Sequence, residues 1–165
     1  MTKLEILPKR FDVLDANDKN CCFRINIDVL NEAFGVGRGM YARASYPDKK
    51  DTYFYGKNTK DKFYIWMPKF YSNSSEWKNS ISEDGSVIYE IAEGDRHEEW
   101  ISEDTDLDAL RLVFVKETTK APYRFVGVFK CGKIDYCNHT YERVATKVRL
   151  IGNPVTHIEL LDDIR

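Results

Sequence analysis

Short apolar segments follow one another closely along this chain, and their spacing limits the folds that it can adopt. The runs LRLVFVK (110–116) and YRFVGVFK (123–130) are separated by one short loop that contains Pro122, which predicts a hairpin or two neighbouring strands. No long helical pattern stands between the apolar segments, and a doubly wound parallel sheet would require such helices. The sequence therefore predicts an α+β, mainly β fold, with a curved antiparallel sheet or a small open β-barrel and two or three short peripheral helices.

The individual elements are predicted from alternation and from turn residues. Alternating residues predict half-buried strands at 22–28, 51–56, 63–67 and 143–150, and a further strand at 86–92 follows the turn at 83–85. Asp28 is expected to cap a short helix at 29–35, which Gly35 would end. A second short helix is expected within 100–110, and the tail HIELLDDI is compatible with a strand or a helical turn.

The length and composition indicate one domain. A chain of 165 residues with 42% hydrophobic and 32% charged residues has the profile of a soluble globular protein. We expect residues 1–165 to form a single domain, with a β-rich module at about 20–152 and a C-terminal tail at 153–165. No run approaches the roughly 18 apolar residues of a membrane span. The N-terminus has no apolar signal region, so we expect a cytoplasmic protein with free cysteine thiols.

Charge is distributed unevenly along the chain, although the net charge is only −2. Residues 38–69 contain eight Lys or Arg against three acids, and residues 109–152 contain nine against three. Residues 93–108 contain eight acids against Arg96. Such a chain can present one basic and one acidic surface, although charges that merely coat a soluble domain would give a similar count.

A metal site is the first chemistry to weigh. Cys131, Cys137 and His139 follow a C-x5-C-x-H spacing, and the Cys21–Cys22 pair lies elsewhere in the chain. Structural zinc sites usually use tight pairs such as C-x2-C, and adjacent cysteines rarely bind one ion together. We therefore expect free thiols, no metal and no cofactor.

The glycine-rich loop at Gly35, Gly37 and Gly39 does not fit a nucleotide-binding motif. A dinucleotide fingerprint requires a strand before the loop and a helix after it. Here a predicted helix precedes the loop, and no Lys-Ser/Thr closes it. The loop can still bring backbone close to a nucleic-acid phosphate, with Arg38 and Arg43 nearby.

A metal-dependent nuclease is a weaker alternative. Asp61 with Glu76 and Lys78 matches an Asp…Glu-x-Lys arrangement, in which the two acids hold magnesium and the lysine stabilises charge. Glu76 lies in a loop rich in Ser and Asn, whereas a catalytic acid is expected on a rigid strand. No histidine lies in a recognisable nucleophile context.

Aromatic residues give the more informative signal. The chain has three Trp, ten Tyr and nine Phe, and many lie in the basic segments, including Tyr41, Tyr46, Tyr53, Tyr55, Tyr64, Trp66, Tyr123 and Phe125. Stacking on an unpaired base contributes about 1–3 kcal/mol, and a neighbouring Lys or Arg can hold the phosphate. Aromatic residues in strands are more often core.

The stretch KFYIWMPKFYSNSSEWKNSISEDG (62–85) combines both possibilities. Alternation places Phe63, Ile65 and Met67 on one face, as core. Tyr64 and Trp66 lie on the other face, where they require either a second packing layer or a ligand.

The order of these segments resembles that of the PUA-like modules, a group that includes the EVE and SRA domains. The residues that carry the resemblance are the glycine-rich loop, the aromatic strand, and the segments WKNSISEDGSVIYEI, LRLVFVK, YRFVGVFK and TYERVATKV, over about residues 30–150. The resemblance implies a curved barrel with a concave pocket, in which aromatic rings hold a flipped, modified base. It also implies partners, since such modules accompany nucleases and helicases of modification-dependent restriction.

Site residues follow from this resemblance. It implies base-binding roles for Tyr41, Tyr64, Trp66 and Trp77, with Asn79 and Asp84 reading the base edge. It implies contacts to the nucleic-acid backbone for Arg38, Arg43, Lys69 and Arg124. The acidic segment 93–108 would have to face away from DNA.

Two hypotheses of different class remain. The first is a non-catalytic module that binds DNA and recognises a flipped, modified base, with a nuclease or helicase as a further partner and no membrane. The second is a protein-interaction or anti-defence protein that mimics DNA through the acidic segment 93–108. The nuclease is a third.

Overall fold

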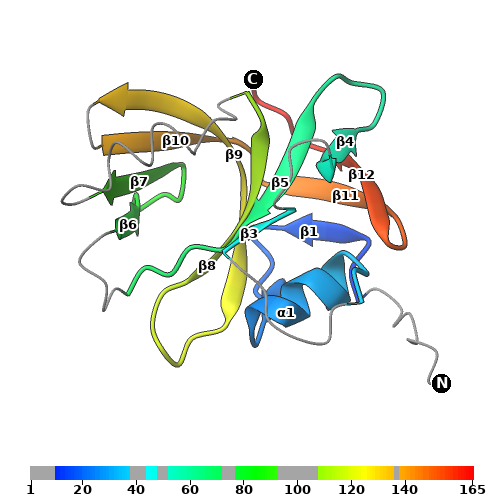
Figure 1. The fold of residues 1–165 in the computed structure, drawn as a ribbon, viewed down its shortest axis with the longest axis horizontal. Helices are drawn as coiled ribbons and strands as arrows, with labels where there is room; N and C mark the ends of the chain where they lie inside the picture. Colours follow the sequence, from blue (N-terminus) through cyan, green and yellow to red (C-terminus); the bar gives the residue numbers. More distant parts are fainter. Residues whose placement is uncertain (1–9, 38–43, 48–51, 72–76, 93–107, 136–137) are drawn as a thin grey trace.

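The computed structural model describes residues 10–37, 44–47, 52–71, 77–92, 108–135 and 138–165. In these ranges twelve strands form one curved mixed sheet, in the order β1-β11-β12-β4-β5-β8-β9-β10-β7-β6, with β2 added to β9 and β3 to β5. Figure 1 shows β6, β7 and the far parts of β9 and β10 as an arm on the left, with β1, β11, β12 and the helix on the right. The predicted mainly β class is confirmed.

The elements succeed one another with short connections. They are β1 (Val13–Asp15), β2 (Cys22–Phe23), α1 (Asn26–Asp28), a π-helical turn η1 (Val29–Ala33), β3 (Ser45–Tyr46), β4 (Phe54–Gly56), β5 (Lys62–Trp66), β6 (Trp77–Ile81), β7 (Val87–Ala92), β8 (Leu110–Lys116), β9 (Tyr123–Asp135), β10 (Asn138–Ala145), β11 (Lys147–Gly152) and β12 (Val155–Leu160). The predicted hairpin of β8 and β9 is confirmed as an antiparallel pair. Two pairs, β12 with β4 and β5 with β8, are parallel.

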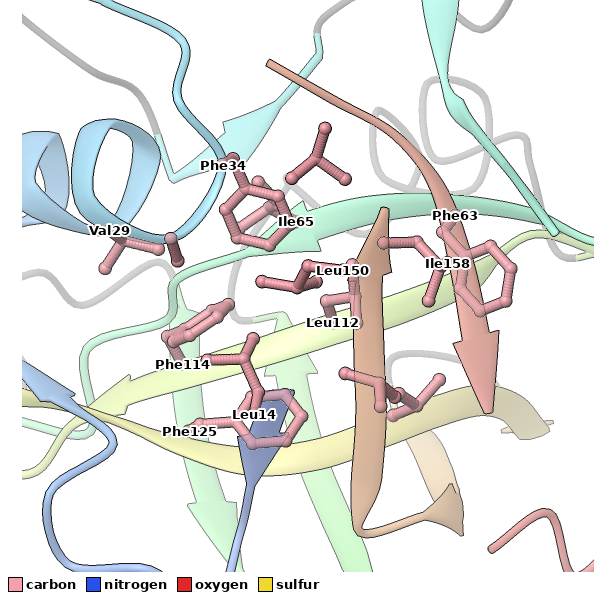
Figure 2. Close-up of a cluster of buried hydrophobic side chains, with 14 of the residues drawn as sticks. Leu14, Val29, Phe34, Phe63, Ile65, Leu112, Phe114, Phe125, Leu150 and Ile158 are labelled. Carbon is pink, nitrogen blue, oxygen red and sulfur yellow. The ribbon is translucent and has the colours of Figure 1, made fainter. Parts of the chain in front are cut away.

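The central strands are buried on both faces, so the molecule has two apolar layers. The larger layer contains Phe63, Ile65 and Met67, which are at most 1% exposed, as alternation predicts. Figure 2 shows how Phe34 of the helical segment packs there with Phe114 and Phe125. The second layer, on the opposite face, contains Tyr64, Trp66, Val113, Phe129 and Tyr141. Strands that are covered on both faces read as continuous apolar runs, which accounts for LRLVFVK.

The helical segment begins earlier than expected. Residues 22–28 were predicted as one strand, but β2 ends at Phe23 and α1 begins at Asn26. Asp28 therefore lies inside the helical segment and makes no capping hydrogen bond, so its predicted capping role is wrong. Three alternating apolar residues are too few to distinguish a strand from a helix start.

The helical segment ends where predicted. Gly35 has φ +67° and donates its N–H to the carbonyl of Asn31 at 3.2 Å, while Val36 donates to Leu30 at 3.1 Å. This is the glycine-terminated helix end that the sequence indicates. It is the one helical segment among the described residues, against two or three expected, and most of the other predicted helix (100–110) lies outside those ranges.

The segment 143–150 was predicted as one strand, but it is divided between β10 and β11. Asp162 accounts for the break, because its carboxylate accepts hydrogen bonds from the backbone N–H groups of Thr146 and Lys147 and from the Thr146 hydroxyl. The alternating pattern carries no signal for this distant partner. Within the tail, β12 is a full strand between β11 and β4.

Candidate nucleic-acid interface

Three polar side chains lie in a line across β6, β7 and β10, and we call them the polar row: Asn79, Glu90 and His139. Asn79 pairs in register with Glu90, and Glu90 pairs with His139. Residues that are directly opposite in adjacent strands project from the same face of the sheet. The row therefore runs from the edge strand β6 into the second apolar layer, where Glu90 is 7% and His139 1% exposed.

Tyr141 connects the polar row to the aromatic rings. Its hydroxyl donates to Glu90 Oε1 at 3.1 Å and lies 3.5 Å from His139 Nδ1. Its ring lies 5.1 Å from that of Trp66. A buried carboxylate requires such hydrogen bonds, because an unsatisfied charge in an apolar layer is very costly.

Arg111 places a positive charge in the middle of these rings. It is 4% exposed, and its guanidinium carbon lies 4.2 Å from the ring centre of Tyr141, 5.0 Å from Trp66 and 5.1 Å from Tyr64. A planar guanidinium suits stacking on several aromatic faces. The layer thus holds a buried cation and a buried carboxylate on opposite sides of Tyr141.

Asn79 supplies a hydrogen-bonding group with nothing to bond. Its side chain is half-buried, and its Oδ1 atom is buried and accepts no hydrogen bond in the part of the chain that the structure describes. A buried acceptor without a donor is unfavourable by about 1–3 kcal/mol. Native structures contain few such atoms, and each requires an explanation.

The structure supplies the second packing layer for Tyr64 and Trp66. They are 5% and 6% exposed, and the ring of Tyr64 also stacks on Tyr53 at 4.9 Å. Both line the wall behind the polar row through their contacts with Arg111. Trp77 begins β6, two residues before Asn79.

Asp84 lies at the other end of β6, in the turn that leads to β7. Its carboxylate accepts from the Ser86 hydroxyl at 2.7 Å, the Ser82 hydroxyl at 2.8 Å and the Ser86 N–H at 3.0 Å. The Ser86 hydroxyl, the Ser86 N–H and the Ser82 hydroxyl, in that order, lower the pKa of Asp84 to about 2. The structure therefore uses Asp84 to hold the turn, and does not bring it beside Asn79.

Lys69 and Arg124 lie at one end of the central strands. Lys69 bridges to Lys116, and Arg124 stands opposite Val115, so three cations gather near the β8–β9 hairpin. Lys69 and Arg124 are exposed, and Arg124 donates to Glu117 at 2.5 Å. Tyr41, Arg38 and Arg43, the acidic segment except Asp108, and Glu76 lie outside the described residues.

The metal and nuclease candidates gain no support. Within the described ranges, no three His, Cys, Asp or Glu side chains gather closely enough to hold a metal ion. The carboxylate of Asp61 is held by Arg165 at 2.7 Å and 3.1 Å, and hydrogen bonding from Arg165 lowers the pKa of Asp61. Cys137 is outside the described residues.

Arg111 and Glu90 are members of this site that we did not predict from the sequence. Each is a charged residue inside an apolar strand segment, LRLVFVK and VIYEIA. Such residues are almost never fully buried unless they have partners. That anomaly is the signal which could have identified both.

Comparison with known proteins agrees with this geometry. The family described as the SET and RING associated (SRA) domain matches residues 12–150, which is most of the chain. Modules of this PUA-like class recognise modified bases in DNA. The chain belongs to the SRA domain family, and the resemblance drawn from its sequence is confirmed.

A solved structure shows the same fold. The enzyme described as "The 5-Hydroxymethylcytosine-Specific Restriction Enzyme AbaSI" is 24% identical, with a TM-score of 0.50, and the match covers 84% of this chain and 42% of that chain. The present chain thus corresponds to less than half of that enzyme. A comparison with curated proteins found no match.

None of the helices in the described ranges has the length and apolar character needed to span a membrane.

Proposed function

We propose that this chain is a non-catalytic DNA-binding module that recognises a modified base flipped out of the duplex, with Asn79 as the residue that reads the base edge. The observation that carries the proposal is the buried Oδ1 atom of Asn79, an acceptor without a donor among the described residues. An amide can pair with a base edge because it offers both a donor and an acceptor.

Cytosine fits the polar row chemically. Its exocyclic amino group is a donor that a carboxylate or an amide oxygen accepts, and its N3 atom accepts from an amide N–H. Glu90 and Asn79 are register partners at the open edge of the sheet. AbaSI is described as specific for 5-hydroxymethylcytosine, and we propose a 5-substituted cytosine as the ligand here too.

The aromatic residues complete the proposed site. Trp77 is on the same strand as Asn79, two residues away, so alternation places both on one face. We propose that Trp77 and Tyr41 contact the flipped base, while Tyr64 and Trp66 fix the floor through Arg111. Lys69 and Arg124, with Arg38 and Arg43, would bind phosphates, a contact that positions the protein without reading sequence. A nuclease or helicase partner is part of the same proposal.

A binding titration with matched duplexes tests this proposal. Wild type is expected to bind a blunt duplex with one 5-hydroxymethylcytosine or 5-methylcytosine about tenfold more tightly than the unmodified duplex. Asn79→Ala should remove most of that preference, since a lost edge contact costs about 1–3 kcal/mol of discrimination.

Two control variants separate reading from positioning. Ser80→Ala, on the opposite face of β6, should keep the preference. Arg124→Ala should weaken binding to both duplexes equally, because a phosphate contact carries no base information. Equal affinity of wild type for both duplexes at every salt concentration would contradict the proposal.

A further inference from the structure

A separate cavity of about 300 Å³ lies on the other side of β5 from the polar row, between β4, the end of β3 and the start of β12. Its lining includes Tyr46, Pro47, Thr52, Tyr53, Tyr55 and Thr156. Three of these are tyrosines from the basic segment 38–69. Asn79, Glu90 and His139 do not line it.

The lining of this cavity selects for a flat and uncharged group. Aromatic and proline rings supply apolar faces, and the tyrosine and threonine hydroxyls can both donate and accept hydrogen bonds. Neither a carboxylate nor a cation is among its lining residues. A charged ligand would lose its hydration here without gaining a partner, so only a neutral ring fits.

Positive charge lies at the rim of the cavity. Lys62 is the register partner of Tyr55, so both side chains project from the same face, and both are exposed, Tyr55 by 49%. Lys57 follows β4 and is also exposed. A ligand that joins a neutral ring to an anionic group would therefore place the ring against Tyr55 and the anion near Lys62.

We infer that this cavity is a second base-binding site, which takes an unpaired nucleobase of a DNA strand with the adjoining phosphate near Lys62. An unpaired base is required because a base stacked inside a duplex exposes neither face. The volume is at the lower end of the range for small-ligand pockets, which suits a single base and its sugar. The inference does not depend on recognition of a modified base by Asn79.

Binding of an unmodified duplex with and without a single-stranded tail tests the inference. A 3′ tail of about four thymidines is expected to increase the affinity of wild type about tenfold, since stacking of one base accounts for a gain of that size. Tyr55→Ala should abolish the gain and leave the affinity for the blunt duplex unchanged, while Tyr55→Phe should retain it.

Tyr89→Ala is the matched control, because Tyr89 is an equally exposed tyrosine (43%) on β7, away from the cavity; it should retain the gain from the tail. Because Tyr55 is exposed, its replacement should leave the unfolding midpoint unchanged, which circular dichroism checks. The inference is overturned if the tail adds no affinity, if Tyr89→Ala and Tyr55→Ala act alike, or if a proline-rich peptide alone occupies the cavity. Loss of modified-base preference in Asn79→Ala bears on the other site only, so the two proposals can fail separately.

Discussion

At the scale of single residues, Arg111 has the strongest influence on the second apolar layer. It is a buried cation that faces three aromatic rings, with Tyr141 at 4.2 Å. A desolvated contact of this kind contributes about 2 kcal/mol, and the aliphatic stem adds packing. The orientation of Tyr141, and hence that of Glu90, depends on it.

Arg111→Ala should therefore lower the free energy of unfolding by about 3 kcal/mol, since it removes both the cation and the packing of the stem. Arg111→Lys should recover only part of this loss, because an ammonium cannot stack as a planar group. Urea denaturation measures both. Arg124→Ala, an exposed arginine on the neighbouring strand β9, is the control and should change stability by less than about 0.5 kcal/mol. An equal effect of both alanine variants would contradict the assigned role of Arg111.

Asp84 gives a prediction for pH dependence. Its pKa of about 2 in the folded protein is below the model value of 3.8 because of the bonds from Ser86 and Ser82. A carboxylate with a lowered pKa stabilises the fold above about pH 4, and this contribution is lost as the pH falls from about 4 to about 2. Asp84→Asn should accordingly melt below wild type at about pH 6, and the difference should shrink through that window. A difference that stays constant down to about pH 2 would show that the charge of Asp84 is not involved.

At the scale of elements, alternation predicted which residues face the core but not where strands break. Phe63, Ile65 and Met67 followed from period-two alternation because one face of β5 covers the larger apolar layer. The break at Thr146 depends on Asp162, which is 16 residues away along the chain. The burial of Arg111 depends on rings from β5 and β10, and such contacts have no local pattern.

Asp162→Ala should test the cause of the break between β10 and β11. Without the carboxylate, the N–H groups of Thr146 and Lys147 lose their acceptor, and a buried donor without a partner costs about 1–3 kcal/mol. We expect a loss of stability of that size, and faster hydrogen exchange at these two amides. Asp163→Ala is the control, because Asp163 makes exposed contacts to Arg165. Unchanged exchange in Asp162→Ala would contradict the explanation.

At the scale of the whole molecule, the curved sheet divides the chemistry between its two ends. The arm of β6, β7 and β10 carries the polar row, and the cavity beside β4 lies across β5 from it. Tyr53 lines that cavity and stacks on Tyr64, whose other neighbour is Arg111. The composition of the chain indicated aromatic groups beside positive charge, but only the fold shows which rings are buried.

Chemical-shift mapping by NMR tests the central claim most directly. On addition of a blunt duplex with one 5-hydroxymethylcytosine, the side-chain amide of Asn79 should show one of the largest changes, together with the backbone amides of Glu90 and His139. The unmodified duplex should shift Lys69 and Arg124 but leave the Asn79 side chain nearly unchanged. Identical Asn79 shifts with both duplexes, or no Asn79 shift while the protein is saturated with modified DNA, would contradict the assignment of the polar row as the base reader.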